Sequence, residues 1–198
     1  MKPTMWLIAG ANGVGKTTYA FRHIRAVSGS DEFVNLDELA RGISPLNVEK
    51  GRIRASRMAV GLIGDLMTAR RSFSLETTLA GRTHLRTVDA ARAAGMEVVI
   101  LYFAVATVET CLYRIARRVA EGGHDVPEVE ARRRWTRSLA NLPSYAEKAD
   151  LWRVFDANGK PAIVAEGRGG CIAMRGDASG LPPPLAVTLD AMPACAGA

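Results

Sequence analysis

A glycine-rich turn near the N-terminus constrains this chain more than any other feature of its sequence. The apolar run 5–9 predicts a strand, and segment 10–18 follows it with the spacing GxxxxGK[ST], opening a predicted helix. The glycines let backbone N–H groups converge on a phosphate at the positive end of that helix. Lys16 can reach the β- and γ-phosphates, and the Thr17 hydroxyl can bind Mg²⁺. We therefore predict ATP and Mg²⁺ as cofactors, with Thr17 as the metal-binding residue. The predicted nucleotide-binding residues are Gly10, Ala11, Asn12, Gly13, Val14, Gly15, Lys16, Thr17 and Thr18.

The bulk composition agrees with one α/β domain carrying short extensions. The chain has 198 residues with 48% apolar side chains, enough for a proper core. No apolar run approaches the ~20 residues that span a bilayer, and the first strand begins almost at once, so we expect no signal peptide and a cytoplasmic protein. Three cysteines, Cys111, Cys171 and Cys195, lie far apart and in no metal-binding spacing. We expect them to be reduced, with Cys111 in the core.

The positive charge is concentrated in one stretch of the chain. The net charge is +6, and seven arginines fall between Arg114 and Arg137. Three interpretations are open: a nucleic-acid surface with Trp135 as a stacking residue, a solvated helix face, or an electropositive lid over a nucleotide. The phosphate-binding motif favours the lid.

An acidic residue follows the second predicted strand, which covers 33–36. In open α/β sheets the ligand crevice lies at the carboxyl ends of the strands, so Asp37 is expected beside the phosphate loop. Its carboxylate can accept a hydrogen bond from an acceptor hydroxyl or hold a water on Mg²⁺. A helix N-cap is the structural alternative for Asp37, and it is compatible with either role.

Polar side chains also end the third predicted strand. A helix over 44–71 precedes it, with its apolar positions Ile53, Ala55, Met58, Ala59, Leu62, Ile63, Leu66 and Met67 expected in the core. The strand covers 72–78, and Glu76 and Thr78 at its end are candidates for holding an acceptor molecule. Arg82 is a third acceptor-binding candidate. A helix then ends near Gly95, and His84 in it has no metal-partner spacing, which favours a surface or capping role.

The fourth predicted strand, 97–104, is apolar throughout, as a central parallel strand should be. No Asp or Glu ends it, although nucleotide hydrolases usually carry an acid at a strand end to hold Mg²⁺. No Asn-Lys-x-Asp sequence is present to recognise guanine. Small kinases place their working carboxylate after the second strand, where Asp37 lies.

Two arginine-rich helices, 107–121 and one opening at 125–128, flank the pair Gly122-Gly123. We predict a closing lid over about 114–137, whose arginines stabilise a transferring phosphate while water is excluded. Cys111, Ile115 and Val119 are expected to face inward. Strands at 151–156 and 161–166 complete the predicted kinase domain, 1–166. Because Gly, Pro and Ala dominate afterwards, we expect 167–198 to be an irregular tail.

The chain resembles the zeta-toxin kinases over about 5–166. The resemblance is carried by segments 10–18, 34–39 and 76–79, and by Arg118 through Gly122-Gly123-His124-Asp125-Val126-Pro127 to Arg132-Arg133-Arg134. It implies an α/β P-loop NTPase fold, a three-layer sandwich with a mostly parallel sheet of about five strands and a helical lid. It also implies transfer of the ATP γ-phosphate to the 3′-hydroxyl of UDP-N-acetylglucosamine, and a small antitoxin as protein partner.

The resemblance also implies a role for individual residues. Asp37 would be the general base, Lys16 and Thr17 would serve phosphate and Mg²⁺, and Glu76 with Thr78 would hold the acceptor. Arg118 and Arg134 would clamp the transferring phosphate, with Arg114 and Arg133 as further candidates.

Two alternatives to a nucleotide-sugar kinase remain open from the sequence. One is a kinase of another metabolite or an antibiotic on the same scaffold. The other is an ATP-gated nucleic-acid-binding module that uses the arginines of 114–137. Nucleic acid is the less favoured partner, because those arginines adjoin the predicted phosphate site, and no membrane partner is expected.

Overall fold

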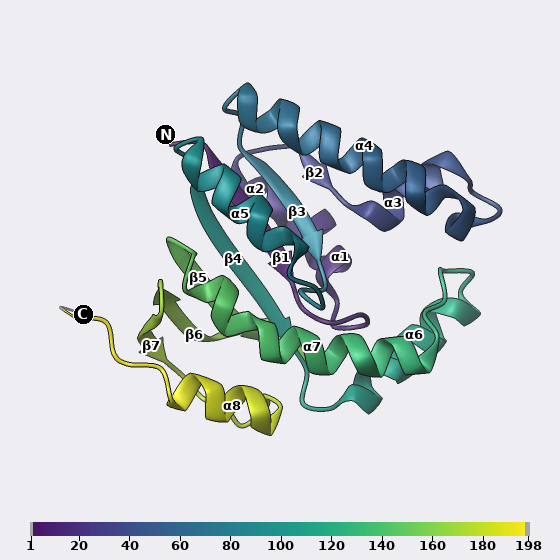
Figure 1. Cartoon of the computed structure of the whole chain (residues 1–198). Coiled ribbons are helices and arrows are strands. Elements are labelled where there is room, and N and C mark those ends of the chain that lie inside the picture. Colours follow the sequence, from purple (N-terminus) through teal and green to yellow (C-terminus); the bar gives the residue numbers. More distant parts are fainter. Residues whose placement is uncertain (1, 197–198) are drawn as a thin grey trace.

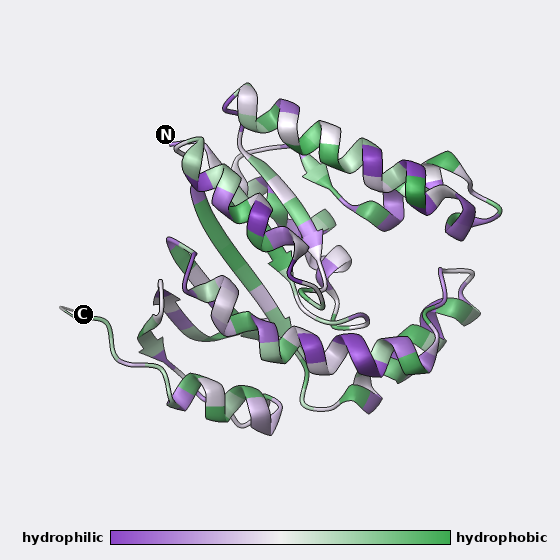
Figure 2. Ribbon diagram, in the orientation of Figure 1, coloured by the Kyte–Doolittle hydropathy of each residue, from purple (hydrophilic) through white to green (hydrophobic). Residues whose placement is uncertain are grey.

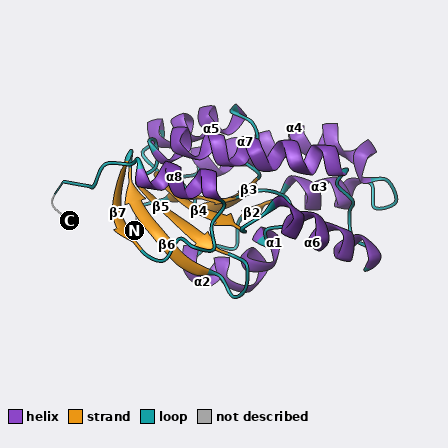
Figure 3. Ribbon diagram, turned by 90° about the horizontal axis from the view of Figure 1, so that it is seen from below, coloured by secondary structure: helices purple, strands orange, loops and turns teal. Residues whose placement is uncertain are grey.

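A twisted β-sheet runs through the middle of the molecule, with helices on both faces (Figures 1 and 3). In the computed structural model, which describes residues 2–196, this sheet has seven strands in the order β2-β3-β1-β4-β5-β6-β7. The first five strands in that order are parallel and the last two pairings are antiparallel. The strands are β1 (Thr4–Ala9), β2 (Phe33–Val34), β3 (Phe73–Thr77), β4 (Glu97–Ala104), β5 (Leu151–Asp156), β6 (Ala162–Arg168) and β7 (Cys171–Arg175). The predicted α/β P-loop fold with a mostly parallel sheet is confirmed, but the sheet has seven strands and not about five.

The helices divide between the two faces of the sheet. A continuous helical segment follows the phosphate loop as α1 (Lys16–Tyr19), the π-helical turn η1 (Ala20–Ile24) and α2 (Arg25–Ser28). The others are α3 (Leu36–Ile43), α4 (Val48–Thr68), α5 (Thr83–Ala93), α6 (Val108–Ala120), α7 (Glu128–Ala146) and α8 (Pro183–Asp190). Figure 3 shows α4, α5, α7 and α8 on one face, and α1, α2 and α6 on the other.

Strand β4 shows why both faces of the sheet must be packed against helices. Its residues alternate between two hydrophobic clusters: Val98, Ile100 and Tyr102 pack under α4, α5 and α7, whereas Leu101 and Phe103 pack against η1 and α6. Figure 2 shows β4 as a nearly continuous hydrophobic strand. The prediction of a central strand at 97–104 is therefore confirmed.

The core predicted for α4 is too wide. Ala55, Ala59, Ile63 and Leu66 are buried, but Ile53 is 70%, Met58 53% and Leu62 37% exposed. The helix lies over the short edge strand β2, so only one narrow stripe meets the sheet and the flanking apolar positions face outward (Figure 1). Val119 of α6 is likewise wrong as a core prediction, because it is 38% exposed.

The prediction of an irregular tail over 167–198 is wrong for two segments. Strand β7 pairs with β6 and extends the sheet, and α8 buries Leu185 and Leu189 in the main core together with Leu181. The proline run does not prevent this helix, because a proline at its first position has no N–H that a helical partner would need. Composition alone therefore misses an amphipathic helix.

The cysteines also depart from expectation. Cys171 at the start of β7 forms a disulfide with Cys195, so the prediction of reduced cysteines is wrong for this pair. Ile172 and Ala194 form a β-bridge beside it, and backbone pairing thus brings the two cysteines together. Cys111 is free and buried, as predicted. Among the described residues, no helix has the length and apolar character to cross a membrane.

Candidate active site

The phosphate loop connects β1 to α1 with a backbone that only glycine accommodates at two positions. Gly10 has φ +132°, and a Cβ there would lie 2.2 Å from the carbonyl oxygen of Phe103. Gly13 has φ +83°, and its Cβ would lie 2.5 Å from the carbonyl oxygen of Cys111. Because β4 and α6 approach the loop this closely, side chains at these positions would displace it. The predicted strand, turn and helix are all present.

Lys16 and Glu76 form a buried pair at the centre of the site. Lys16 donates to the carbonyl oxygen of Ala11 at 2.8 Å, and its Nζ lies 3.9 Å from Oε1 of Glu76. The two side chains are only 6% and 12% exposed. Burial lowers the pKa of Lys16 and raises the pKa of Glu76, because each charge has lost most of its water. The site therefore holds two charges that a bound phosphate and cation would compensate.

Glu76 reaches this position because β3 lies next to β1, with Ile8 paired to Glu76. The acid beside Thr17 thus comes from the end of β3, and not from the end of β4, where nucleotide hydrolases usually carry it. The Thr17 hydroxyl lies 2.9 Å from both carboxylate oxygens of Glu76 and donates its proton to them. The lone pairs of Thr17 then remain available to a cation. This oxygen donor set fits Mg²⁺, which prefers one or two protein oxygens together with phosphate and water.

Asp37 lies in the first turn of α3. The N-cap of this helix is Asn35, whose side-chain oxygen accepts from the backbone N–H groups of Asp37 and Glu38, so the N-cap alternative for Asp37 is wrong. Asn35 also donates to Glu76 at 2.8 Å, which ties α3 to β3. Nη2 of Arg52 on α4 lies 3.2 Å from Oδ1 of Asp37. The carboxylate is therefore held by a cation that the sequence analysis did not identify.

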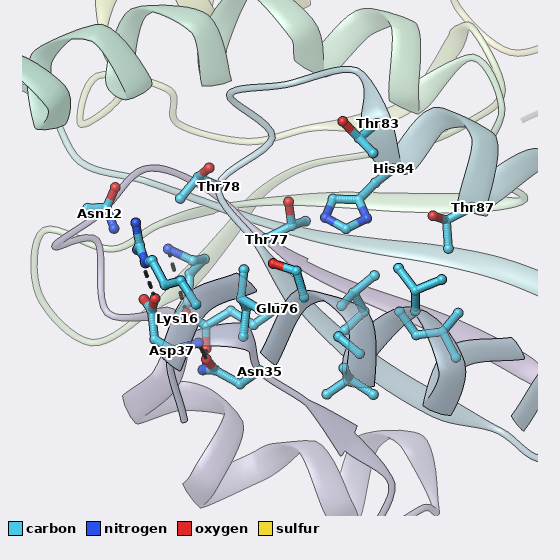
Figure 4. Close-up of a pocket in the computed structure, with 18 of the residues that line it drawn as sticks. Asn12, Lys16, Asn35, Asp37, Glu76, Thr77, Thr78, Thr83, His84 and Thr87 are labelled. Atoms are coloured by element: carbon cyan, nitrogen blue, oxygen red, sulfur yellow. Dashed lines mark hydrogen bonds and ion pairs between the residues drawn. The ribbon is translucent and has the colours of Figure 1, made fainter. Parts of the chain in front are cut away.

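Two cavities meet at these residues. One, of about 780 Å³, follows the phosphate loop and α6, and we name it the nucleotide cavity. The other, of about 580 Å³, lies between the end of β3 and helices α3, α4 and α5, and we name it the acceptor cavity. Asn12, Lys16, Asp37 and Glu76 line both cavities. Figure 4 shows the acceptor cavity with Lys16, Asp37, Glu76 and Asn35 gathered at one end.

The arginines predicted to clamp phosphate reach different cavities. Arg118 lines the nucleotide cavity, where its Nη2 donates to the carbonyl oxygen of His124 at 2.6 Å. Arg134 lines the acceptor cavity and lies 3.4 Å from the side-chain oxygen of Asn12. Arg114 donates to the carbonyl oxygens of Ala157 and Asn158 at the far wall of the nucleotide cavity.

Three of the four remaining arginines of this stretch pair with acids on the surface. Arg117 pairs with Glu121, Arg132 with Glu109 and Glu128, and Arg133 with Glu130. Such pairing uses up the charge that a nucleic-acid surface would need to present to phosphates. The contacts favour a nucleotide site edged by a solvated helix face.

Of the three residues predicted to bind the acceptor, two lie at the acceptor cavity and one does not. Glu76 and Thr78 both line the acceptor cavity, as the sequence suggests. Arg82 is not among the residues that line it; its side chain is exposed and lies 3.4 Å from Ser144 on α7. The expectation that His84 lies on the surface or caps a helix is wrong, because His84 is half-buried and lines the acceptor cavity. His84, in the first turn of α5, thus lines the cavity, whereas Arg82, just before this helix, does not.

The catalytic roles of Asp37, Lys16, Arg118 and Arg134 stay predictions. Arg52 and Asn35 were missed. An asparagine before an amphipathic helix is an N-cap pattern that identifies Asn35, whereas nothing in the sequence pairs Arg52 with Asp37.

Comparison with known proteins identifies the family of this chain and supports its fold. A family model described as an AAA domain, AAA_33, matches residues 5–142. A protein of Haemophilus influenzae, described as an uncharacterized protein, is 33% identical over 119 residues, which are 60% of this chain and 83% of that protein.

Solved structures share the fold at low identity. A chain of the AvrRxo1-ORF1:AvrRxo1-ORF2 complex with ATP has a TM-score of 0.68 and 19% identity, over 87% of this chain and 60% of that chain. A chain of the PezAT toxin–antitoxin system of Streptococcus pneumoniae has a TM-score of 0.64 and 17% identity, over 83% and 72% of the two chains. This chain thus spans about three fifths of the AvrRxo1 chain that it matches. The chain belongs to the AAA domain family AAA_33 and has the α/β fold of the P-loop NTPases.

Proposed function

We propose that this protein is an ATP-dependent kinase that transfers the γ-phosphoryl group of ATP to a hydroxyl of a small molecule. The observation that carries the proposal is the meeting of the two cavities at Lys16, Asp37 and Glu76. A nucleotide on one side and an acceptor on the other would bring the reacting phosphorus and oxygen together at that junction. The carboxylates of Asp37 and Glu76 line both cavities, so they lie where two bound molecules would meet.

Each residue of the junction has a defined task in this proposal. The backbone of the phosphate loop and Lys16 hold the β- and γ-phosphates, where Lys16 offsets charge on the transferring group. Mg²⁺ bound at Thr17 would supply further neutralisation of the phosphate oxygens. Arg118 and Arg134 approach from α6 and α7 and stabilise the same charge.

Asp37 orients the acceptor hydroxyl and takes its proton. The acceptor oxygen forms a bond to the γ-phosphorus while the bond to the β,γ-bridging oxygen breaks, and ADP leaves with that electron pair. The proton passes from the hydroxyl to Asp37 and then to solvent. Arg52, whose Nη2 lies 3.2 Å from Oδ1 of Asp37, fixes the direction of the carboxylate. The transition state is loose, so orientation of the hydroxyl is the larger part of this contribution.

The finer proposal is that the acceptor is a nucleotide sugar, with UDP-N-acetylglucosamine phosphorylated at its 3′-hydroxyl. It rests on the resemblance to zeta-toxin kinases through segments 10–18, 34–39 and 118–134. A small antitoxin-like protein partner belongs to the same proposal. The titles of two similar structures name a complex of AvrRxo1-ORF1 with ORF2 and the PezAT toxin–antitoxin system.

An acceptor screen with ATP tests the kinase proposal. ADP release is measured for the wild-type protein, Asp37→Asn, and Asp65→Asn, which removes an exposed carboxylate of α4 as a matched control. We expect ADP formation to depend on an acceptor, to fall by about 10²–10⁴ in Asp37→Asn, and to stay unchanged in Asp65→Asn. Nucleotide affinity should be retained in all three proteins.

Two results would overturn the kinase proposal. One is equal ADP production with and without any acceptor, which would indicate a hydrolase. The other is a fall of less than tenfold in Asp37→Asn, which would remove Asp37 from the reaction. Activity with a sugar alcohol or an antibiotic, but with no nucleotide sugar, would keep the kinase and reject the finer proposal.

A further inference from the structure

The acceptor cavity has a second end that the proposed transfer reaction does not use. This end lies between α4, the end of β3 and α5, and we name it the distal half. Figure 4 shows His84 and Thr87 on the far side of Thr77 from Lys16 and Asp37. The residues that line the distal half are Ser56, Ala59, Val60, Ile63, Thr77, Thr83, His84 and Thr87.

Charge is distributed unevenly along the cavity. Its acids and cations engage one another or the phosphate loop: Asp37 lies 3.2 Å from Arg52, Glu76 lies 3.9 Å from Lys16, and Arg134 lies 3.4 Å from the loop residue Asn12. The distal half, in contrast, is lined by four hydroxyl groups, the aliphatic side chains of Ala59, Val60 and Ile63, and one imidazole. A charged ligand group placed there would lose water without meeting an opposite charge.

His84 is the polar residue of the distal half whose burial and hydrogen bonding indicate which ligand group it can bind. Its Nδ1 is buried and has no hydrogen-bond partner among the described residues. Burial also lowers the pKa of His84, and no acid contributes in the opposite direction, so the ring is neutral near pH 7.

The tautomer of His84 follows from this burial. A buried N–H without a partner is rarer and more costly than a buried lone pair, so the proton belongs on Nε2. Because Nδ1 is sealed off, Nε2 is the nitrogen that a ligand in the cavity can reach. His84 therefore offers one donor to an oxygen atom, and the surrounding threonine and serine hydroxyls can donate or accept.

We propose that the distal half binds an uncharged, oxygen-rich group of the acceptor, such as a sugar ring, and that His84 selects it against a carboxylate. This rests on the proposed function for the identity of the cavity as the acceptor site. Val60 supplies an apolar contact for the carbon face of the ring, while the hydroxyls and His84 meet its oxygens. A carboxylate in the same place would find no cation among the lining residues of the distal half.

Direct binding tests this proposal without requiring turnover. The full chain is loaded with Mg²⁺ and a non-hydrolysable ATP analogue, and titrated by calorimetry with UDP-glucose and with UDP-glucuronate. These two probes differ only by a hydroxymethyl or a carboxylate on the sugar. Free glucose and glucuronate form a second pair that lacks the nucleotide. We expect the neutral member of a pair to bind at least 30-fold more tightly than the anionic member.

Variants of His84 identify the residue responsible. His84→Gln keeps an N–H donor and should bind the neutral probe within about fivefold of wild type, whereas His84→Leu should lose about tenfold. His84→Lys adds a cation and should reduce the neutral-to-anionic preference at least tenfold. Unchanged affinity for the ATP analogue shows that each variant is folded.

The outcomes separate this proposal from the kinase proposal. Equal binding of the neutral and anionic probes, an unchanged preference in His84→Lys, or no binding of either pair overturns the role of the distal half. Tight, selective binding without any phosphorylation would uphold the distal half and reject the kinase. Phosphorylation of glucuronate and glucose at equal rates would uphold the kinase and reject the role of the distal half.

Discussion

Replacing Lys16 by Met and Glu76 by Gln together should leave the protein, without nucleotide, at least as stable as the wild type. Their charged atoms lie 3.9 Å apart and are almost fully buried, so their mutual attraction is about 4 kcal/mol at an effective dielectric constant of about 20. The desolvation of each ion costs several kcal/mol. Two such costs exceed one attraction, and burial indeed shifts the pKa of each group toward its neutral form.

The double variant removes both costs at once. We therefore expect its free energy of unfolding to equal the wild-type value or to exceed it by about 1–4 kcal/mol. Lys16 and Glu76 would then contribute to phosphate binding and not to the stability of the fold. Mg²⁺ and ATP should raise the wild-type thermal midpoint and leave that of the double variant unchanged, because Lys16 no longer meets the phosphates.

The single variant Lys16→Met behaves differently, because it leaves Glu76 buried without its cation. We expect a loss of about 3–5 kcal/mol at pH 7. The folded-state pKa of Glu76 lies above its ordinary value of 4.5, so protonation favours the folded state. The stability should be fully present below pH 4.5 and be lost as the pH rises through the raised pKa of Glu76.

Urea unfolding followed by circular dichroism at pH 5 and pH 7 measures these differences. The reasoning is refuted if the double variant is less stable than the wild type by more than about 1 kcal/mol. It is also refuted if Lys16→Met is equally stable at both pH values. Either result would mean that water reaches Lys16 and Glu76, so that the junction of the two cavities does not desolvate them as their burial indicates.

Three further predictions concern the fold around the site. Leu185→Ala should lower the free energy of unfolding by about 2–5 kcal/mol in urea unfolding, whereas Val187→Ala, at a 68% exposed position of the same helix, should change it by less than about 0.5 kcal/mol. Equal effects would mean that α8 does not pack on the core. Cys171→Ser opens the link to Cys195, which spans 24 residues, and should cost about 3 kcal/mol relative to the oxidised wild type; a reductant that lowers the variant and the wild type equally would contradict this. Asn35→Ala removes the N-cap of α3 and should cost about 1 kcal/mol by the same assay, and no loss would show that this cap is dispensable.

The parts of the fold that sequence predicts well are those encoded by short, local patterns. The motif 10–18 determines its own turn, because its glycines have no substitute where β4 and α6 approach. The strand 97–104 is apolar on both faces and can only be central. The helix at 183–190 was not predicted, because its sequence begins with prolines. Its Leu185 and Leu189 pack in the main core, among residues distant in the sequence.

The candidate site divides in the same way. Lys16, Thr17 and Asp37 follow from the motif and from the rule that ligands bind beyond the carboxyl ends of strands. The contact of Glu76 with Thr17 depends on β3 lying beside β1, which the chain order does not specify. The choice of His84 over Arg82 depends on the loop before α5, where the buried Leu79 adopts φ +52°. A non-glycine residue in that conformation leaves no sequence pattern, so the direction of the following side chains was not predictable.

The contacts of α7 limit how the predicted lid can close. Asn141 and Tyr145 of this helix donate to the carbonyl oxygens of Leu79 and Gly81, and so hold the loop between Thr78 of the acceptor cavity and α5. The same helix carries Arg134 to the phosphate loop, and its second half is buried in the core. A rigid-body swing of α7 would therefore break the acceptor site while moving the arginine. Arg118 is already folded against the tip at 122–124, where it donates to His124. We therefore expect a local motion, in which Arg118 exchanges one carbonyl oxygen for a phosphate oxygen while α7 stays in place.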